Sequence, residues 1–247
     1  MVLRAMLVLL LALYGAFAQA GGTDSPPSVI YLASEEWEDY TAADGHGLAW
    51  DVLRQVFEPA GVKVEIRTEP YVRSMGLAER GEVDACVGSY RDESGEVLYP
   101  RWNFDTDHIY ALGLASSPVP TPQTLGNFRL AWVRGYDYQH YLPNVQHFDE
   151  VMRRTGIESM LTHNRADFYI DALTEVDYVL NRAKDPSRLR RTHIAELPLY
   201  LCFAKTPQAR TLMALFDQRM ESLVKSGELK PVFERWNQPY PFSDSQM

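Results

Sequence analysis

The sequence predicts an α/β fold, because short apolar strands alternate with amphipathic helices along its first hundred residues. Composition agrees with a folded globular protein: 46% of the 247 residues are hydrophobic and 12% are aromatic, so a sizeable core can form. The net charge is −9, which argues against nucleic acid or an anionic membrane as a partner.

Residues 1–20 have the three parts of a secretory signal peptide. Arg4 supplies positive charge, residues 5–17 are apolar, and Ala18-Gln19-Ala20 has the form of a cleavage site. The apolar run is shorter than the roughly 20 residues that span a bilayer. We therefore expect cleavage after Ala20 and export, in a bacterium to the periplasm. An uncleaved membrane tether is the alternative.

The first part of the chain predicts a strand, a helix and a second strand. Residues 29–33 (VIYLA) form an apolar run typical of a buried strand. Residues 48–57 place their apolar side chains on one face of a helix. Residues 62–66 then alternate between apolar and charged, which predicts a strand with one solvated side.

A second helix and a third strand lead to a polar loop. Pro70 favours a helix start, Gly81 favours its left-handed end, and residues 83–87 form a short apolar strand. The loop after this strand carries a hydroxyl, an aromatic ring and a guanidinium, at Ser89, Tyr90 and Arg91. Ligands of open α/β sheets bind at the carboxyl ends of strands, so this loop is suited to recognise a small polar molecule.

Later segments continue the pattern. Residues 116–123 contain three prolines, which predicts a stiff extended stretch. Strands are expected at 109–115, 129–133, 168–170 and 197–204, and helices between 170 and 182, at 208–224 and in a last short segment ending near Trp236.

Four segments, taken in order, resemble the extracytoplasmic solute-binding proteins of amino-acid ABC transporters (family 3). Residues 69–95 contain Pro-Tyr-Val-Arg followed by RGEVDA, and the other segments are 44–66, 125–138 and 222–237. The resemblance covers essentially the whole chain after the signal peptide. It implies a type II periplasmic-binding-protein fold, with two α/β lobes, each a sheet flanked by helices, and two hinge crossings.

The resemblance also implies where the lobes divide. Lobe one would hold residues 28–117 and 203–247, and lobe two would hold residues 118–198. The crossings between them are expected at 116–122 and 197–203. Periodicity alone does not supply this two-crossing topology.

The function implied by the resemblance is binding rather than catalysis. Such a protein captures a small polar ligand, an amino acid or small carboxylate, between its lobes and delivers it to an inner-membrane ABC permease. We expect a monomer without a cofactor. Two alternatives stay open: a ligand-sensing subunit for a membrane receptor, and a periplasmic dehydratase-like enzyme on the same fold.

Signatures of other chemistry are few. The sequence contains neither G-x-S-x-G nor H-E-x-x-H. The six histidines show no metal-ligand spacing, and two cysteines cannot make a four-thiolate site. We therefore expect no metal.

The candidate ligand contacts come from both lobes. They are Trp37, Tyr40, Tyr71, Arg73, Ser89, Tyr90, Arg91, Gly135, Tyr136 and Asp171. Arg73 and Arg91 are the candidate forks for a ligand carboxylate, because the family's usual arginine position, counted from Asp84, holds Glu96 here. A surface ion pair is the alternative for each arginine.

The remaining candidates also have alternatives. Gly135 is expected to cap a helix with Tyr136 to Tyr138 and to present amides to the ligand carboxylate, or else to be a plain turn glycine. Asp171 is expected to hold an ammonium group, or else to be the N-cap of the next helix. The aromatic side chains stack on the ligand or pack in the core, and the loop 34–47 lines the site or is simply solvated.

Two further expectations follow. Opposed charges in the cleft, an arginine in lobe one and Asp171 with residues 35–39 opposite, predict a zwitterionic, amino-acid-like ligand. Cys86 and Cys202 lie on strands assigned to the same lobe, and neighbouring strands give strained disulfide geometry, so we expect two buried free thiols.

Overall fold

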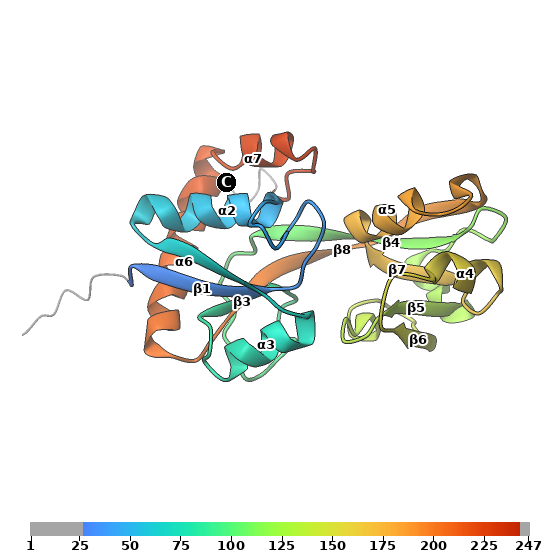
Figure 1. Ribbon diagram of the computed structural model, residues 1–247, viewed down its shortest axis with the longest axis horizontal. Helices are drawn as coiled ribbons and strands as arrows, with labels where there is room; N and C mark the ends of the chain where they lie inside the picture. The colour runs from blue at the N-terminus through green and yellow to red at the C-terminus, as the bar shows by residue number, and fades with distance from the viewer. Residues whose placement is uncertain (1–26, 243–247) are drawn as a thin grey trace, which may run out of the picture.

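The structure, a computed structural model, describes residues 27–242 and shows two α/β lobes of unequal size joined by two long strands (Figure 1). This confirms the predicted fold class. The expected signal peptide lies outside the described residues. Within the part of the chain that is described, no helix has the length and apolar character needed to cross a membrane.

Lobe one, the larger, follows the predicted alternation of strands and helices. Its elements are β1 (Val29–Ser34), α2 (Leu48–Phe57), the 3₁₀ helix η1 (Glu58–Ala60), β2 (Lys63–Thr68), α3 (Tyr71–Glu79), β3 (Ala85–Ser89), α6 (Pro207–Ser226) and α7 (Lys230–Arg235). Helix α2 buries Leu48, Val52 and Val56, as its periodicity predicts. Gly81 has a φ of 69° just after α3, the left-handed conformation expected there. Figure 1 shows α2 and α3 on opposite faces of the strands.

Lobe two is built from shorter elements. They are the 3₁₀ helix η2 (Pro122–Asn127), β5 (Arg129–Val133), the 3₁₀ helix η3 (Tyr138–His140), β6 (His147–Val151), α4 (Ile157–Thr162), β7 (Phe168–Ala172), α5 (Leu173–Asn181) and the 3₁₀ helix η4 (Pro186–Arg188). Strand β6 was not predicted, because four of its five residues are exposed and it lacks an apolar face. It pairs in parallel with β5 at the edge of the sheet.

The chain passes between the lobes on β4 (Asp105–Leu114) and β8 (Leu189–Phe203). The two strands pair in antiparallel fashion, β4 also pairs with β7 through residues 109–113, and β8 continues into lobe one to pair with β3. Residues 109–114 therefore belong with the sheet of lobe two. The first crossing between the lobes therefore precedes residue 109. We had expected it at 116–122, after these residues. The polar sequence of residues 105–108 conceals the start of this strand.

The eight strands of residues 27–242 form one continuous sheet, in the order β2-β1-β3-β8-β4-β7-β5-β6. The main hydrophobic core fills lobe one around Trp50, Phe57 and Phe216, and extends to Trp132 in lobe two. A second cluster, which includes Ile157, lies between α4, α5 and the strands of lobe two. The sheet is thus shared, and the main core continues from lobe one into lobe two.

Cys86 on β3 and Cys202 on β8 form a disulfide, and our expectation of two free thiols is wrong. The two residues are direct partners in the antiparallel register, with a Cα–Cα distance of 5.0 Å. That separation lies within the roughly 4.4–6.8 Å found for disulfides. Both side chains are fully buried, so the bond ties the crossing strand to the centre of lobe one.

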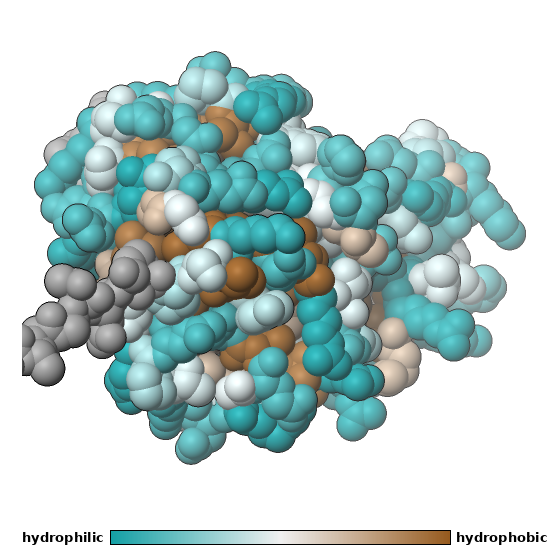
Figure 2. Space-filling view, turned by 60° about the vertical axis from the view of Figure 1, so that its left-hand side comes forward, coloured by the Kyte–Doolittle hydropathy of each residue, from teal (hydrophilic) through white to brown (hydrophobic). Residues whose placement is uncertain are grey.

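The face of the protein shown in Figure 2, with lobe one turned forward, is largely hydrophilic, and its hydrophobic patches are separated by hydrophilic side chains. Val72 on α3 and Met152 after β6 are the most exposed of the large hydrophobic side chains, at 62% and 72%, and both line a groove that also contains Gly135. One wall of this groove comes from each lobe, so it marks the rim of the cleft.

Candidate ligand-binding site

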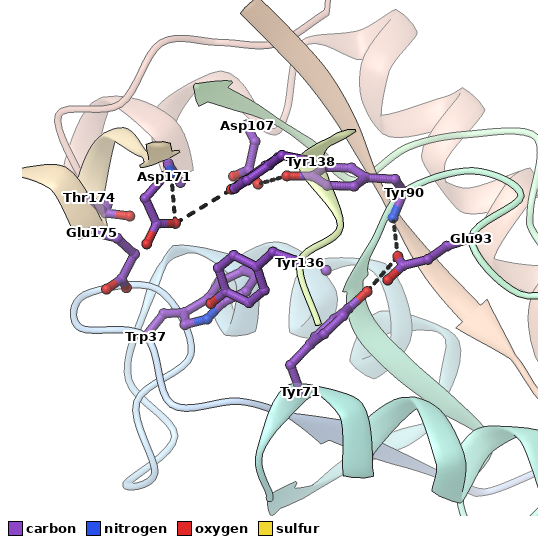
Figure 3. A pocket seen from close by; sticks show the side chains of 12 residues that line it. Trp37, Tyr71, Tyr90, Glu93, Asp107, Tyr136, Tyr138, Asp171, Thr174 and Glu175 are labelled. Carbon is purple, nitrogen blue, oxygen red and sulfur yellow. Dashed lines mark hydrogen bonds between the residues drawn. The ribbon is translucent and has the colours of Figure 1, made fainter. Parts of the chain in front are cut away.

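A small pocket lies between the two lobes (Figure 3). Its walls are formed by Trp37, Tyr71, Gly88, Tyr90, Glu93, Asp107, Tyr136, Tyr138, Asp171, Ala172, Thr174 and Glu175. Five of these side chains are aromatic and four are carboxylic acids, and the lining includes no lysine, arginine or histidine. The cavity volume of about 20 Å³ is close to the space that one water molecule needs. An amino-acid-sized ligand can therefore enter only when the lobes separate.

Glu93 forms the acidic end of the pocket on lobe one. Its Oε2 atom accepts hydrogen bonds from the Tyr71 hydroxyl at 2.6 Å, the Ser89 hydroxyl at 2.9 Å and the Tyr90 amide at 3.1 Å. All three donors are neutral. Burial raises the pKa of Glu93, and the hydrogen bonds from Tyr71 and Ser89 oppose that rise.

Asp107 lies on β4, where the chain crosses between the lobes. It accepts a hydrogen bond from the Tyr90 hydroxyl at 2.9 Å, and burial raises its pKa to about 8. Asp105, two residues earlier, accepts one from Tyr40 at 2.7 Å, and burial raises its pKa to about 7. These carboxyls thus sit near the balance between neutral and charged forms at neutral pH.

The acids of lobe two, together with Glu35 of lobe one, are arranged differently, around Arg154. The guanidinium lies 2.7 Å from Glu175 Oε2, 3.1 Å from Asp171 Oδ2 and 3.8 Å from Glu35 Oε1. It also donates to the Tyr136 hydroxyl at 2.6 Å. Only 13% of the Arg154 side chain is exposed. Burial lowers the pKa of Arg154, but attraction to Asp171, Tyr136 and Glu175 outweighs it and raises the pKa, so the guanidinium stays charged.

Three acids share this single guanidinium, which leaves the group with excess negative charge when all are ionised. Burial raises the pKa of Glu175, and the nearby Asp171 and Glu35 act in the same direction. Asp171 is held further by the hydroxyl of Tyr169 and by the amide of Ala172 at 2.9 Å. The lobe-two side of the pocket is therefore already a connected network.

The lobes contact each other directly across the pocket. The Tyr136 hydroxyl donates to Glu35 at 3.2 Å, and the rings of Tyr71 and Tyr136 meet edge to face at 5.9 Å. Tyr90 and Tyr141 form a second edge-to-face pair at 4.6 Å. These contacts would have to break for a ligand to enter.

Two glycines allow close approach at the pocket. Gly88 has a φ of 89°, and a Cβ atom there would lie 2.5 Å from the Trp37 ring. Gly135 has a φ of 87°, and its Cβ would lie 2.5 Å from Val72 Cγ2. The first glycine lets Trp37 close the floor of the pocket, and the second lets lobe two approach α3.

Half of the candidate residues line the pocket. Trp37, Tyr71, Tyr90, Tyr136 and Asp171 are all among its walls. Figure 3 shows Asp171 and Glu175 on one side of the pocket and Glu93 on the other, with Asp107 and the aromatic rings between them.

Two more candidates lie close by. Tyr40 lines a neighbouring pocket that shares Trp37 and Asp107, and Ser89 lies behind the wall as a donor to Glu93. Since Trp37 and Tyr40 are buried, the loop 34–47 is not a simply solvated loop.

The two candidate arginines lie away from the pocket. Arg73 is 62% exposed and pairs with Glu69 at 3.2 Å, which is the surface alternative. Arg91 donates to the carbonyl oxygens of Pro100 at 2.8 Å and Arg101 at 3.2 Å, and its guanidinium lies 4.3 Å from the centre of the Tyr200 ring. Each arginine has a local partner, and neither lines the pocket.

The expected helix cap at Gly135 is also wrong. Residues 138–140 make only the 3₁₀ turn η3, with Asp137 in a left-handed conformation before it. The Gly135 amide donates to Glu150 Oε1 at 3.1 Å, so it is already occupied. Asp171 does not cap α5 either, because Ala172 holds the N-cap position.

Sequence reasoning missed Glu93, Asp107, Tyr138, Glu175 and Arg154. Glu93 could have been predicted, because it lies three residues after Tyr90 in the loop that we had chosen as part of the site. Asp107 was missed because we predicted this strand to begin at residue 109, whereas β4 begins at Asp105. Arg154 lies in an irregular segment between β6 and α4, where no periodicity or motif distinguishes it.

Comparison with known proteins bears on the fold alone. No protein-family model matches the sequence, and no curated protein matches it. Among solved structures, EhuB in complex with hydroxyectoine superposes with a TM-score of 0.67 at 19% identity, over 86% of this chain and 89% of that one. A histidine kinase sensor domain with similarity to periplasmic binding proteins gives 0.66 at 15% identity, over 85% and 96%.

A third similar structure is the substrate-binding protein of an amino acid ABC transporter, with a TM-score of 0.64 at 17% identity, over 84% of this chain and 98% of that one. The similarity spans nearly the whole of each of these domains, including both lobes and the crossing strands. The chain has the two-lobed fold of the substrate-binding proteins of amino-acid ABC transporters.

Proposed function

We propose that this protein is an exported solute-binding protein whose pocket holds a small ligand with a positively charged group. The observation that carries the proposal is the lining of the pocket: four carboxyl groups and five aromatic rings, with no basic side chain among them. Carboxylates attract an ammonium or guanidinium group, and aromatic faces bind cations through their quadrupoles. Cationic amino acids and small ammonium compounds are the ligand classes that match.

The lining of the pocket favours a cationic ligand over the zwitterion expected from the sequence. A zwitterion required an arginine of lobe one in the cleft, and Arg73 and Arg91 have other partners. Arg154 is the guanidinium nearest the pocket, but Asp171 and Glu175 already neutralise it. The cationic part of the ligand is therefore the part that the pocket recognises, with Glu93 and Asp107 as its principal partners.

We propose that closure of the lobes around the ligand produces the form that a membrane partner recognises. Closure brings Tyr136 against Tyr71 and Glu35, so a ligand between them adds contacts to both lobes. The partner is an inner-membrane ABC permease, and the binding protein acts as a monomer. Retention of the ligand-loaded protein by a receptor kinase, and not by a permease, would instead assign it a sensing role.

The test is a thermal-shift screen of the purified protein. Arginine, lysine, putrescine and choline are the cationic probes, and glutamate, succinate and glucose are the controls. A ligand present at about 100 times its Kd adds about 2.7 kcal/mol to the free energy of unfolding. We expect stabilisation by at least one cationic probe and none by the controls.

Variants then locate the ligand. Glu93→Gln and Asp107→Asn should weaken binding of that probe, whereas Glu79→Gln, an exposed acid on α3, should not. Stabilisation by glutamate alone would contradict the cationic assignment. Consumption of the bound compound would show that the protein is an enzyme.

A further inference from the structure

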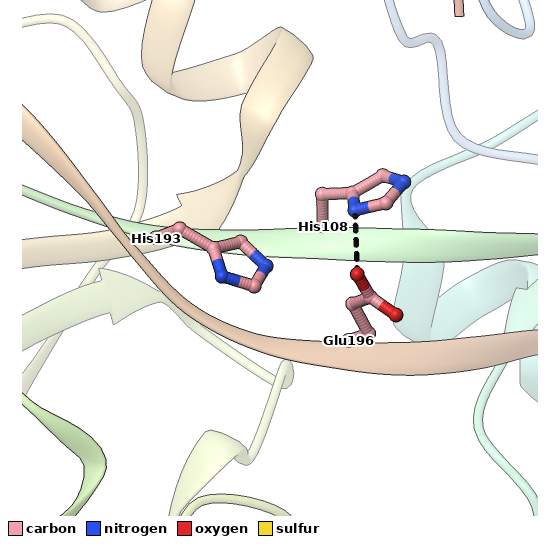
Figure 4. Close-up of side chains that lie close together, drawn as sticks. All are labelled: His108, His193 and Glu196. Atoms are coloured by element: carbon pink, nitrogen blue, oxygen red, sulfur yellow. Dashed lines mark ion pairs between the residues drawn. The ribbon is translucent and has the colours of Figure 1, made fainter. Parts of the chain in front are cut away.

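A cluster of metal-ligating side chains lies outside the pocket, on the two strands that join the lobes. His108 is on β4, while His193 and Glu196 are on β8. Their candidate ligand atoms all lie within 4.8 Å of one another (Figure 4). His108 Nδ1 and Glu196 Oε1 are already only 3.5 Å apart.

An irregularity in β8 brings the three side chains to one face. Glu196 is the register partner of His108, and cross-strand partners point to the same side of a sheet. His193 would point to the opposite side from Glu196 in a regular strand, because they are three residues apart. The register shifts between Ile109 and Tyr110, so that Ile194 is left over and His193 faces Tyr110. This bulge turns His193 onto the face that carries His108 and Glu196.

We propose that His108, His193 and Glu196 bind a divalent transition-metal ion of the Zn²⁺ class. Two imidazoles and a carboxylate are a ligand set that Zn²⁺ accepts, with bonds of about 2.0–2.2 Å and a fourth position for water. Ligand atoms of a tetrahedral site with such bonds are about 3.4 Å apart. The pair His108–Glu196 meets this spacing, and the candidate ligand atom of His193 lies within 4.8 Å of both.

The surroundings suit a metal ion. His193 and Glu196 are exposed, so an ion can reach them from solvent, and His108 is partly buried with 20% of its side chain exposed. Imidazole coordinates metal in its neutral form, which predominates for an ordinary histidine at neutral pH.

A metal ion at this site would link the two strands that cross between the lobes. Since β4 and β8 carry the chain from one lobe to the other, an ion held by both strands would bind them together where the lobes meet. The inference is independent of what the pocket binds.

The test is calorimetric titration of the untagged, chelator-treated protein with ZnCl₂. We expect one ion per chain and a higher melting temperature with the metal. Loss of a group that only supports a metal ligand costs about 10–100-fold in affinity, so loss of a ligand should cost at least that. His193→Ala and Glu196→Gln change exposed residues and should leave the fold intact while reducing the Zn²⁺ affinity at least tenfold.

His147→Ala is the matched control, because His147 is an exposed histidine on β6 away from the cluster. It should bind Zn²⁺ like the parent protein. MgCl₂, which prefers oxygen ligands, should not raise the melting temperature. The proposal is overturned if the parent shows no saturable Zn²⁺ binding, or if His193→Ala and His147→Ala bind it equally well.

Discussion

The two halves of the pocket hold their acids by opposite means. On lobe one, Glu93 accepts hydrogen bonds from two hydroxyls and an amide, all of them neutral. On lobe two, Asp171 and Glu175 are paired with the charged guanidinium of Arg154. The same residue type thus lacks a charged partner on one side of the cleft and has one on the other.

This difference separates binding from stability. An acid held by neutral donors still gains from a cation, so Glu93 and Asp107, which both line the pocket, can act on a ligand. An acid already paired with arginine gains little from a second cation, and removal of that arginine leaves a buried charge unpaired. Lobe one should therefore govern ligand affinity, and the lobe-two network should govern stability.

The largest expected effect is that of Arg154→Met. The substitution leaves the buried Asp171 and Glu175 and the partly buried Glu35 without their shared guanidinium, and breaking a buried ion pair from one side typically costs about 3–5 kcal/mol. Urea unfolding should show a loss of this size at neutral pH. Each kcal/mol corresponds to about 2–4 °C in melting temperature for a chain of this length.

Arg73→Ala is the matched control for this substitution. Its side chain is 62% exposed and pairs with Glu69 on the surface, so its loss should change the free energy of unfolding by less than about 0.5 kcal/mol. Equal free energies of unfolding for the two variants would show that the Arg154 network does not stabilise the fold.

Reduction of the Cys86–Cys202 disulfide is the next largest effect. The bond joins β3 to β8 and closes a loop with a sequence separation of 116. Loss of a native disulfide typically costs about 2–5 kcal/mol. Urea unfolding with and without a phosphine reductant measures this cost. Since the chain contains only these two cysteines, the effect originates in lobe one.

A double variant, Cys86→Ala with Cys202→Ala, serves as the control and should be insensitive to the reductant. An intact mass equal to that of the reduced chain, together with two titratable thiols in the unreduced protein, would contradict the disulfide.

The fold could be read from the sequence wherever apolar periodicity was strong. The predicted helix 48–57 and strand 129–133 coincide with α2 and β5. The prediction was too short for β4 and β8, because their crossing halves are polar or alternate irregularly around the bulge at Ile194. Pairing with another strand, and not local composition, makes those segments strands.

Among the residues that line the pocket, the sequence predicted four of the aromatic residues and Asp171. Trp37, Tyr71 and Tyr90 stood in loops or at helix starts beside strand ends, where ligands are expected. Arg154 could not be found, because its role depends on acids 17 and 21 residues further along the chain, at Asp171 and Glu175. Which arginine meets which acid is decided by the tertiary structure.

A smaller effect is expected in the pH dependence of binding. Burial raises the pKa of Asp107 to about 8, so the carboxyl is mainly neutral below that pH in the free protein. A bound cation favours the charged form, so binding releases a proton. The affinity for the tightest cationic probe should therefore rise with pH from about 6 to about 8, by at most about tenfold per unit for each proton released. Calorimetry in two buffers of different ionisation enthalpy counts the protons.

Asp107→Asn tests the assignment of this proton. The folded parent keeps the proton that the unfolded chain releases near pH 4, so the stability that comes from a neutral Asp107 is lost as the pH rises towards 8. The asparagine variant should be more stable than the parent at about pH 8, and its cation affinity should be weaker and flatter with pH. An unchanged pH profile would assign the proton to Glu93 or Glu175.

The smallest effect on ligand binding is expected from Arg73→Ala and Arg91→Ala, although the sequence alone had pointed to these arginines as the ligand clamp. Arg91 holds the carbonyl oxygens of Pro100 and Arg101, so its loss should lower stability by about 1 kcal/mol per hydrogen bond and leave the Kd of a cationic probe unchanged. Arg73 should affect neither quantity. Titration calorimetry of both variants measures this directly. A tenfold weaker Kd in either one would mean that an arginine turns into the cleft when the ligand binds. In that case lobe one would hold an anionic group as well, the ligand would be a zwitterion, and the contrast between the two halves of the pocket would no longer hold.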